Sequence, residues 1–213
     1  MRAVPLGDSA ITFVFGTERS AELLNRVHTA AAALAAERLP DVQDIVPAYL
    51  GVTVFYDPLR ASYSEMAAKL LAICERVKDS TTDADKIRVH EIPVSYDGPD
   101  LEAVSVSCGL SREEVIARHS SRRYTVDLLG FVPGFGYLSE LDPSLRLPRR
   151  PQPRPRVPAG SVAIAGAQTA IYPLDTPGGW HIIGRTDAVL FDPRRDQPSL
   201  LRAGDIVRFV PLP

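Results

Sequence analysis

The chain has 213 residues, of which 45% are apolar and 23% charged, a composition typical of a folded globular protein with one large domain or two small ones. Its formal net charge of −2 gives no overall attraction to nucleic acid or to anionic membranes, so neither is an expected partner. No run approaches the roughly 18 apolar residues that a membrane-spanning helix needs.

The start of the chain and its cysteines both favour a cytoplasmic protein. Pro5 and Asp8 stand where a signal peptide would need an unbroken apolar run, so we expect no targeting segment. Cys74 and Cys108 belong to no CxxC motif, which favours reduced and mostly buried thiols. We therefore expect cytoplasmic localisation.

The first elements alternate between strand and helix. Residues 10–15 are rich in β-branched and aromatic side chains, which predicts a strand. Residues 18–38 predict a helix, because apolar side chains recur at helical spacing at Ala21, Leu24, Val27, Ala31 and Leu34. Residues 46–56 return to a strand pattern and predict two short strands broken near Gly51.

A second helix is predicted from about Tyr63. Ser62 and Glu65 have the spacing of a capping box. The stripe that follows indicates a core-facing side and comprises Met66, Leu70, Cys74 and Val77. Residues 79–86 are polar and predict a linker. Residues 1–85 are therefore predicted to form an N-terminal α/β sandwich domain.

The second part, residues 86–213, is predicted to be a mostly β domain. Residues 89–96 predict a strand, and residues 102–108 and 112–119 predict helices, the latter opened by a capping box at Ser111 and Glu114. From residue 124 onward, short strands are punctuated by Gly and Pro, which is typical of a barrel or a sandwich.

The loop at residues 130–138, GFVPGFGYL, is the first candidate for a binding function. Glycine permits positive φ and close backbone approach, and Pro133 stiffens the turn. One interpretation is a wall facing a ligand, formed by Pro133, Gly134, Phe135 and Tyr137. The alternative is a structural hairpin whose aromatic side chains fold into the barrel.

A run of arginines and prolines follows at residues 146–156. The prolines favour an extended, stiff segment, which orders guanidinium groups that can bind carboxylate or phosphate. The arginines are Arg146, Arg149, Arg150, Arg154 and Arg156. A solvated basic loop, an acidic partner surface and nucleic acid are the alternatives; the last is disfavoured because the chain has no nucleic-acid motif and is net negative.

Two further stretches supply candidate binding residues. Glycine within a strand often marks a closely approached backbone, and Gln168 has an amide that could bind a ligand or satisfy a strand end. The only tryptophan follows a Gly-Gly turn and is either packed or exposed to substrate. The substrate-binding candidates from these stretches are Gly160, Tyr172, Gly179, Trp180, Arg185 and Thr186.

Several catalytic signatures are missing from the sequence. It contains no GxxxxGK[ST] phosphate loop and no GxSxG nucleophile elbow. Its four histidines have no metal-ligand spacing, so no metal site is expected; they are His28, His90, His119 and His181. Nothing in the residues specifies a self-sufficient active site.

Four motifs, in this order, carry a resemblance to a known family: GFVPGFGYL, PRRPQPRPRVPAGSVAIAG, QTAIYP and PGGWHIIGRT. With them, the chain resembles the carboxyltransferase-domain subunit-1 family, also called the allophanate hydrolase subunit 1 or KipI-like family. The resemblance extends over essentially the whole chain. It implies an α+β fold, in which the small α/β sandwich is followed by a cyclophilin-like β-barrel.

The resemblance also implies a function as part of an enzyme, the ATP-dependent opening of 5-oxo-L-proline to L-glutamate. It implies direct pairing with a C-type protein of the same enzyme, a further A-type protein, and ATP as co-substrate, as Mg-ATP at a site shared with a partner. Arg149, Arg150, Arg154 and Gln168 are then the expected catalytic residues, because phosphoryl transfer needs cations beside the moving phosphoryl group.

Two other functions known in this family remain alternatives. One is inhibition of a histidine kinase, which would make the chain a binding protein. The other is the carboxyltransferase half of a urea carboxylase or allophanate hydrolase-type system.

Overall fold

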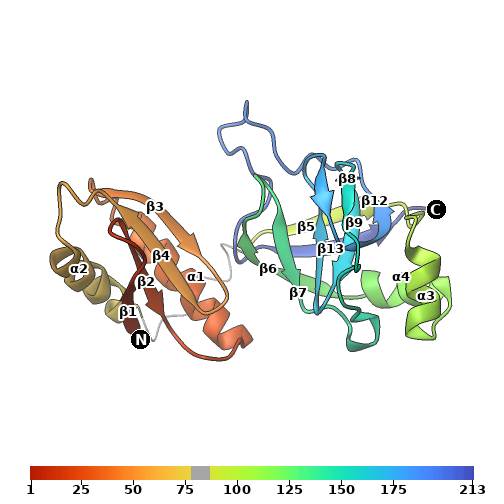
Figure 1. Ribbon diagram of the computed structural model, residues 1–213, viewed down its shortest axis with the longest axis horizontal. Helices are drawn as coiled ribbons and strands as arrows, with labels where there is room; N and C mark the ends of the chain where they lie inside the picture. Colours follow the sequence, from red (N-terminus) through yellow and green to blue (C-terminus); the bar gives the residue numbers. More distant parts are fainter. Residues whose placement is uncertain (78–86) are drawn as a thin grey trace. The chain divides into compact units, whose positions relative to one another are not determined.

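Apolar side chains at every second position form one face of an antiparallel sheet at the start of the chain (Figure 1). The structure is a computed structural model that describes residues 1–77 and 87–213. The strand order is β1-β2-β4-β3. The strands are β1 (Arg2–Pro5), β2 (Ala10–Val14), β3 (Val42–Pro47) and β4 (Gly51–Tyr56). One face packs against two helices, α1 (Ala21–Ala36) and α2 (Tyr63–Arg76). This arrangement is the predicted sandwich of one sheet and one helical layer.

The helix starts follow local sequence signals. The Ser20 side chain accepts a hydrogen bond from the backbone of Leu23, so α1 begins at residue 21 rather than at the predicted residue 18. The predicted capping box of Ser62 and Glu65 is confirmed at the start of α2. The predicted core stripe of α2 is confirmed at Met66, Leu70 and Cys74, which are buried, whereas Val77 is only half-buried and the buried Ile73 was not predicted.

Two strand predictions for this unit need correction. β1 was not predicted, and β3 begins at Val42 instead of residue 46. A register shift between Val42 and Asp44 breaks the two-residue alternation there, and this irregularity hid the start of the strand from periodicity.

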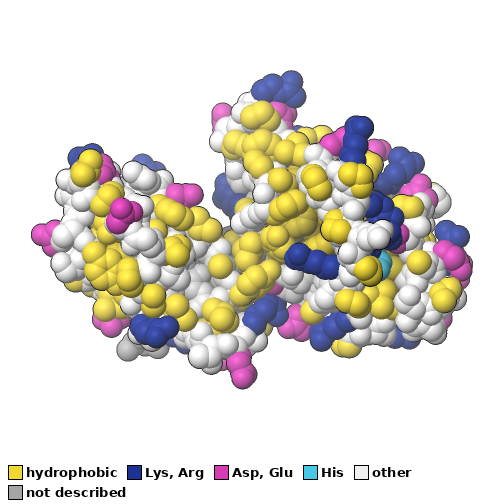
Figure 2. Space-filling model, viewed as in Figure 1, with side chains coloured by type: hydrophobic (Ala, Val, Ile, Leu, Met, Phe, Trp, Pro, Cys, Tyr) yellow, Lys and Arg dark blue, Asp and Glu magenta, His cyan; other side chains and the backbone are white. Residues whose placement is uncertain are grey.

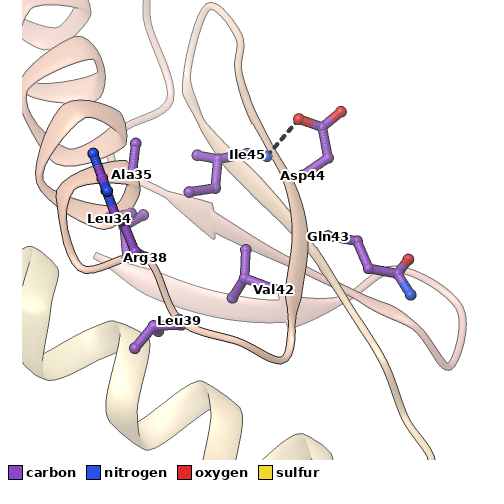
Figure 3. A pocket seen from close by; sticks show the side chains of 8 residues that line it. All are labelled: Leu34, Ala35, Arg38, Leu39, Val42, Gln43, Asp44 and Ile45. Carbon is purple, nitrogen blue, oxygen red and sulfur yellow. Dashed lines mark hydrogen bonds between the residues drawn. The ribbon is translucent and has the colours of Figure 1, made fainter.

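A cleft of about 320 Å³ lies between the end of α1 and β3 (Figure 3). Its lining is Leu34, Ala35, Arg38, Leu39, Val42, Gln43, Asp44 and Ile45. Leu34, Leu39, Val42 and Ile45 also belong to or pack on the core of this unit. The cleft is therefore the open margin of the core, and its lining includes no residue predicted to bind substrate.

The chain divides into two units, Met1–Ile87 and Arg88–Pro213. The predicted linker, residues 79–86, lies outside the described residues. The second unit contains a seven-stranded sheet of order β12-β9-β10-β7-β6-β13-β5. Its strands are β5 (Val89–Val94), β6 (Arg123–Leu129), β7 (Gly136–Ser139), β9 (Ser161–Ala165), β10 (Gln168–Ile171), β12 (His181–Arg185) and β13 (Ile206–Pro211).

The two ends of this sheet meet, which gives the predicted barrel. Ser95, just after β5, and Arg185, at the end of β12, exchange two backbone hydrogen bonds of 2.9 Å. The helices α3 (Leu101–Cys108) and α4 (Arg112–Ser120) follow β5, and the predicted capping box of Ser111 and Glu114 is confirmed at the start of α4. The predicted α+β fold, a sandwich followed by a barrel, is confirmed.

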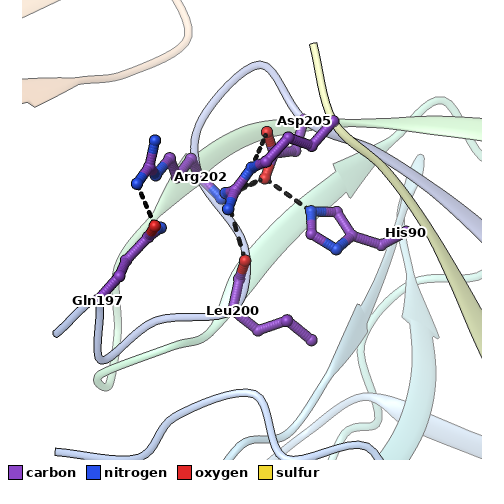
Figure 4. A network of polar contacts seen from close by, with 6 residues as sticks. His90, Gln197, Leu200, Arg202 and Asp205 are labelled. Atoms are coloured by element: carbon purple, nitrogen blue, oxygen red, sulfur yellow. Dashed lines mark hydrogen bonds and ion pairs between the residues drawn. The ribbon is translucent and has the colours of Figure 1, made fainter. Parts of the chain in front are cut away.

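A buried carboxylate joins β5 to β13 near the start of the barrel (Figure 4). Asp205 accepts from Arg88 at 2.6 Å, from His90 Nε2 at 2.9 Å and from the backbone of Arg202 at 2.9 Å. Since β13 pairs with β5 in parallel, this network fixes the ends of both strands. It therefore has a structural role.

The central strands β9 and β10 bury both of their faces. One face forms the main core with residues such as Ile164, Leu138 and Phe209. The other face presents three alanines, Ala163, Ala165 and Ala170, and a smaller second core forms on them. This second core, together with the short β8 (Arg154–Val157) and β11 (Thr176–Gly178) pair, positions the candidate site.

Candidate functional site

The loop at residues 130–135 is a tight hairpin. Gly130 N–H donates to Phe135 O at 3.1 Å, and Phe135 N–H donates to Val132 O at 3.1 Å across the turn at Pro133 and Gly134. Gly134 has φ of +81°, and a Cβ there would lie 2.7 Å from the Cβ of Phe191. Steric demand alone thus accounts for this glycine. A role of Pro133 and Gly134 in binding substrate stays a prediction.

Four aromatic rings from separate strands and loops form a cluster on the alanine face. Phe135 is 2% exposed and lies at its centre, with ring centroids 5.0 Å from Tyr137, 5.3 Å from Tyr172 and 5.8 Å from Trp180. Large rings fit here because β9 and β10 present alanines on this face. Phe135 and Trp180 are thus mainly packed, and Tyr137 is the half-exposed ring of the cluster.

Two arginines of the predicted cluster converge on a carboxylate that the sequence did not indicate. Arg150 Nη1 and Arg154 Nη2 each lie 2.7 Å from Asp100 Oδ1. The other carboxylate oxygen accepts from the backbone N–H of Ile182 at 2.7 Å. The backbone of Arg150 donates to Gly179 O at 2.8 Å. The Arg–Pro segment is therefore tied to the turn that carries Trp180.

Asp100 stays ionised in spite of its burial. Burial would raise its pKa, but hydrogen bonds from Arg154 and from the Ile182 backbone, together with the charges of Arg154 and Arg150, outweigh burial and lower the pKa below its ordinary value. The site is thus a salt-bridged ion triplet with a side-chain exposure of 5% at the acid.

The remaining arginines of the segment differ in their surroundings. Arg146 and Arg149 are exposed, and Arg156 pairs with the exposed Asp175 at 2.5 Å. Burial raises the pKa of Tyr172, and the positive charges of Arg149 and Arg154 oppose that rise. Arg154 pairs with Gly178, which lies directly against Tyr172, so this arginine is close to the aromatic cluster. Figure 2 shows basic side chains around a hydrophobic area on the barrel unit.

The other predicted residues lie at the margins of this region. Gln168 begins β10 opposite Ala165, on the alanine face. A Cβ on Gly160 would lie 2.2 Å from Thr186 O, so backbone packing explains this glycine. Arg185 pairs with the exposed Asp97 at 3.1 Å, an ion pair separate from the Asp100 triplet. Thr186 accepts from the backbone of Ala188 at 3.2 Å.

Asp100 is the residue that sequence reasoning missed. It lies 50 residues before Arg150, and directly before α3 it has the position of an ordinary helix cap, although its side chain makes no cap hydrogen bond. The available signal was indirect, since closely spaced arginines in a folded segment need a carboxylate partner.

A buried histidine network also escaped prediction. His119 is fully buried, with Nδ1 2.7 Å from Tyr96 Oη and Nε2 2.9 Å from Thr169 Oγ1. Because the Thr169 hydroxyl donates its single proton to Ala163 O at 3.0 Å, Nε2 must be the protonated nitrogen and Nδ1 accepts from Tyr96. Burial lowers the pKa of His119 to about 3. The ring is neutral and structural.

Neither a metal site nor a membrane span is evident in residues 1–77 and 87–213. Within these ranges, no group of three His, Cys, Asp or Glu side chains is arranged to hold a metal ion. None of the helices described there combines the length and apolar character that crossing a membrane requires.

The same architecture occurs in a solved structure of low sequence identity. Urea amidolyase of K. lactis shares the fold, with a TM-score of 0.75 over 99% of this chain and 15% of that protein, and at 19% identity the likeness shows the fold alone. The family described as "Carboxyltransferase domain, subdomain C and D" matches residues 1–201, which reach into both units, and the chain belongs to this family.

Curated relatives resemble this chain over most of their length. The B subunit of 5-oxoprolinase from Bacillus subtilis (strain 168) is 43% identical over 217 residues, which cover 96% of this chain and 90% of that protein. The corresponding B subunit of Escherichia coli O157:H7 is 48% identical over 179 residues, covering 83% of this chain and 82% of that protein. The resemblance seen in the four motifs is thereby confirmed.

A solved structure shows a longer relative. The crystal structure of TTHA0988 is 45% identical, with a TM-score of 0.86. The match covers 96% of this chain, but the chain spans only 40% of the length of TTHA0988.

Proposed function

We propose that this chain is the B subunit of an ATP-dependent 5-oxoprolinase, which opens 5-oxo-L-proline to L-glutamate together with partner proteins. The curated relatives, which are named as B subunits of 5-oxoprolinase, support this assignment. The observation that carries the chemistry is the ion triplet, in which two guanidinium groups share the single carboxylate of Asp100 and so keep a surplus positive charge beside the aromatic cluster.

The reaction explains why positive charge is needed. The lactam carbonyl is a poor electrophile, and transfer of the ATP γ-phosphoryl group to its oxygen makes the carbon reactive toward water. The ring C–N bond then breaks, phosphate leaves, and the products are L-glutamate, ADP and phosphate. Cationic donors stabilise the charge that develops on the transferring phosphoryl group.

The roles of this chain's residues follow from their exposure and charge. Arg150 and Arg154 are partly exposed, at 32% and 23% of their side chains, and we assign them to the phosphate or to the substrate carboxylate. Arg149 is exposed near Tyr172 and supplies a third guanidinium. Gln168 lies on the same face and is assigned to the lactam amide. Mg-ATP would bind at a site shared with the C-type partner, and the A-type protein completes the enzyme.

Reconstitution tests the proposal. The chain alone, and the chain with its A-type and C-type partners, are assayed for ADP and L-glutamate release that depends on 5-oxo-L-proline. Activity is expected only in the complete mixture. A folded and assembled complex without this activity would overturn the proposal and favour the kinase-inhibitor or carboxyltransferase alternatives.

Alanine variants test the arginines within the same assay. Arg149→Ala, Arg150→Ala and Arg154→Ala, combined, should lower turnover at least about a hundredfold while assembly of the complex, followed by size-exclusion chromatography, is retained. Arg156→Ala is the matched control, because Arg156 belongs to the same segment but pairs with the exposed Asp175, and it should keep full activity. Normal turnover of the triple variant would remove these arginines from the mechanism.

A further inference from the structure

We propose that Asp100 is a positioning residue, which holds Arg150 and Arg154 together as one rigid, net-positive receptor for an oxyanion. The inference rests on the proposed function and deepens it, because it assigns a residue that lies outside the Arg–Pro segment. The oxyanion is either the carboxylate of 5-oxo-L-proline or a phosphoryl group of ATP, since guanidinium forks bind both.

Backbone contacts that involve neither arginine hold Asp100 in place. Asp100 N–H donates to Ile182 O at 3.0 Å, and Ile182 N–H donates to Asp100 Oδ2 at 2.7 Å. Two residues earlier, a Cβ on Gly98 would lie 2.4 Å from Ile182 O, so the chain before α3 packs directly on the backbone of β12. With Oδ2 occupied by the strand, Oδ1 alone is left to gather Arg150 and Arg154.

The charge balance makes this gathering useful for binding an anion. One carboxylate neutralises one of the two guanidinium groups, and the triplet retains a formal charge of +1. Holding two like charges near one another is unfavourable without the carboxylate between them. Asp100 therefore makes a concentrated positive charge stable in a partly buried place, where it attracts an anion more strongly than it would in water.

The guanidinium groups also retain donors that the protein does not use. Arg150 Nε and Arg154 Nη1 are buried and have no hydrogen-bond partner among the described residues. Unsatisfied buried donors cost free energy. The pair is thus held together at a cost to stability.

The site contains its own reporter. Trp180 is the only tryptophan of the chain, and it lies between Gly179, which accepts from Arg150, and Ile182, which donates to Asp100. A single indole N–H resonance in a ¹H–¹⁵N NMR spectrum therefore follows events at the triplet without ambiguity of assignment.

The test compares anion binding by the full-length wild-type chain and by the Asp100→Asn variant. Trp180 is followed while 5-oxo-L-proline, L-glutamate or inorganic phosphate is added in separate titrations. Removing a negative charge would strengthen anion binding if only net charge mattered. Positioning predicts the opposite sign, a loss of affinity of about tenfold. A shift of the Trp180 resonance with 5-oxo-L-proline or L-glutamate assigns the site to the substrate carboxylate. A shift with phosphate alone assigns it to a phosphoryl group of ATP.

Several results would overturn the inference. They are unchanged or tighter binding by folded Asp100→Asn, and the absence of a response in the wild type to all of the anions. Asp175→Asn is the matched control, because it removes the same charge beside Arg156 in the same region and should leave affinity unchanged. If Asp100→Asn does not fold, the Arg150→Lys/Arg154→Lys variant keeps the charge and loses the fork; equal affinity in that variant also overturns the inference.

The assembled enzyme separates this inference from the proposed function. Asp100→Asn should raise KM about tenfold for the substrate whose anion binds here and change KM for the other substrate little. A purely structural role would instead lower the amount of active enzyme and leave both KM values unchanged. Asp100→Glu, which restores the charge, should recover part of the affinity. An inactive wild-type complex with Asp100-dependent anion binding would reject the proposed function and leave the receptor in place.

Discussion

The neutral, buried His119 makes the stability of the barrel unit depend on pH. In the unfolded chain its pKa is the ordinary 6.5, whereas in the folded barrel burial lowers the pKa to about 3. Between these values the unfolded state binds a proton that the folded state does not. The contribution of His119 to the free energy of unfolding is therefore fully present above pH 6.5 and decreases as the pH falls toward 3.

The magnitude follows from the two pKa values. At pH 5 the unfolded state gains RT ln(1 + 10^1.5), which is about 2 kcal/mol, while the folded state gains almost nothing. Carboxylates contribute little between pH 7 and pH 5, because their ordinary pKa values lie near 4. The part of the loss that disappears when His119 is replaced, about 2 kcal/mol over this interval, is thus assigned to this ring.

Urea unfolding at pH 7 and pH 5, followed by the fluorescence of Trp180, measures this loss in the barrel unit itself. The His119→Gln variant removes the titrating ring, so it should be less stable at pH 7 yet lose about 2 kcal/mol less than the wild type on acidification. His181→Gln, at the partly exposed histidine of β12, is the control and should behave as the wild type. Equal pH dependence in the wild type and in His119→Gln would refute the reasoning.

Two further predictions concern stability. Gly160→Ala should destabilise the barrel by about 3 kcal/mol or more, because its Cβ would meet Thr186 O at 2.2 Å with φ at +79°. Gly166→Ala is the control and should cost only about 1 kcal/mol, because Gly166 has φ of +57° and open space around it. Similar losses of stability for both variants in thermal unfolding would contradict the steric argument. Asp205→Asn should cost about 3 kcal/mol because it leaves a buried basic network without its carboxylate. The exposed Glu91→Gln should change the free energy of unfolding by less than about 0.5 kcal/mol, and comparable effects in urea titrations would count against the structural role of Asp205.

Local signals accounted for much of the fold. Both predicted capping boxes formed, because the hydrogen bonds of Ser62 and Ser111 involve residues only three positions away. The strand β1 and the early start of β3 depend instead on pairing with distant strands, which the periodicity of a single segment does not contain.

The candidate site was only partly accessible to the same reasoning. The Arg–Pro segment identified positive charge, but the partner of Arg150 and Arg154 is set by the way α3 begins on β12, which depends on the closed barrel. The same limit applies to His119, whose partners lie 23 and 50 residues away. Sequence spacing indicated the cations, and tertiary structure supplied the groups that hold them.

The parallel pairing of β5 with β13 has a consequence for the synthesis of the protein. Residues paired across these two strands are 117 positions apart in sequence, as Glu91 and Arg208 show, and β13 also separates β5 from β6. On the ribosome, the earliest barrel strand therefore waits with an unpaired edge until almost the whole unit has been translated. The sandwich unit has no such requirement and can fold while the barrel is still being made, so the nascent chain should need protection mainly during this second interval.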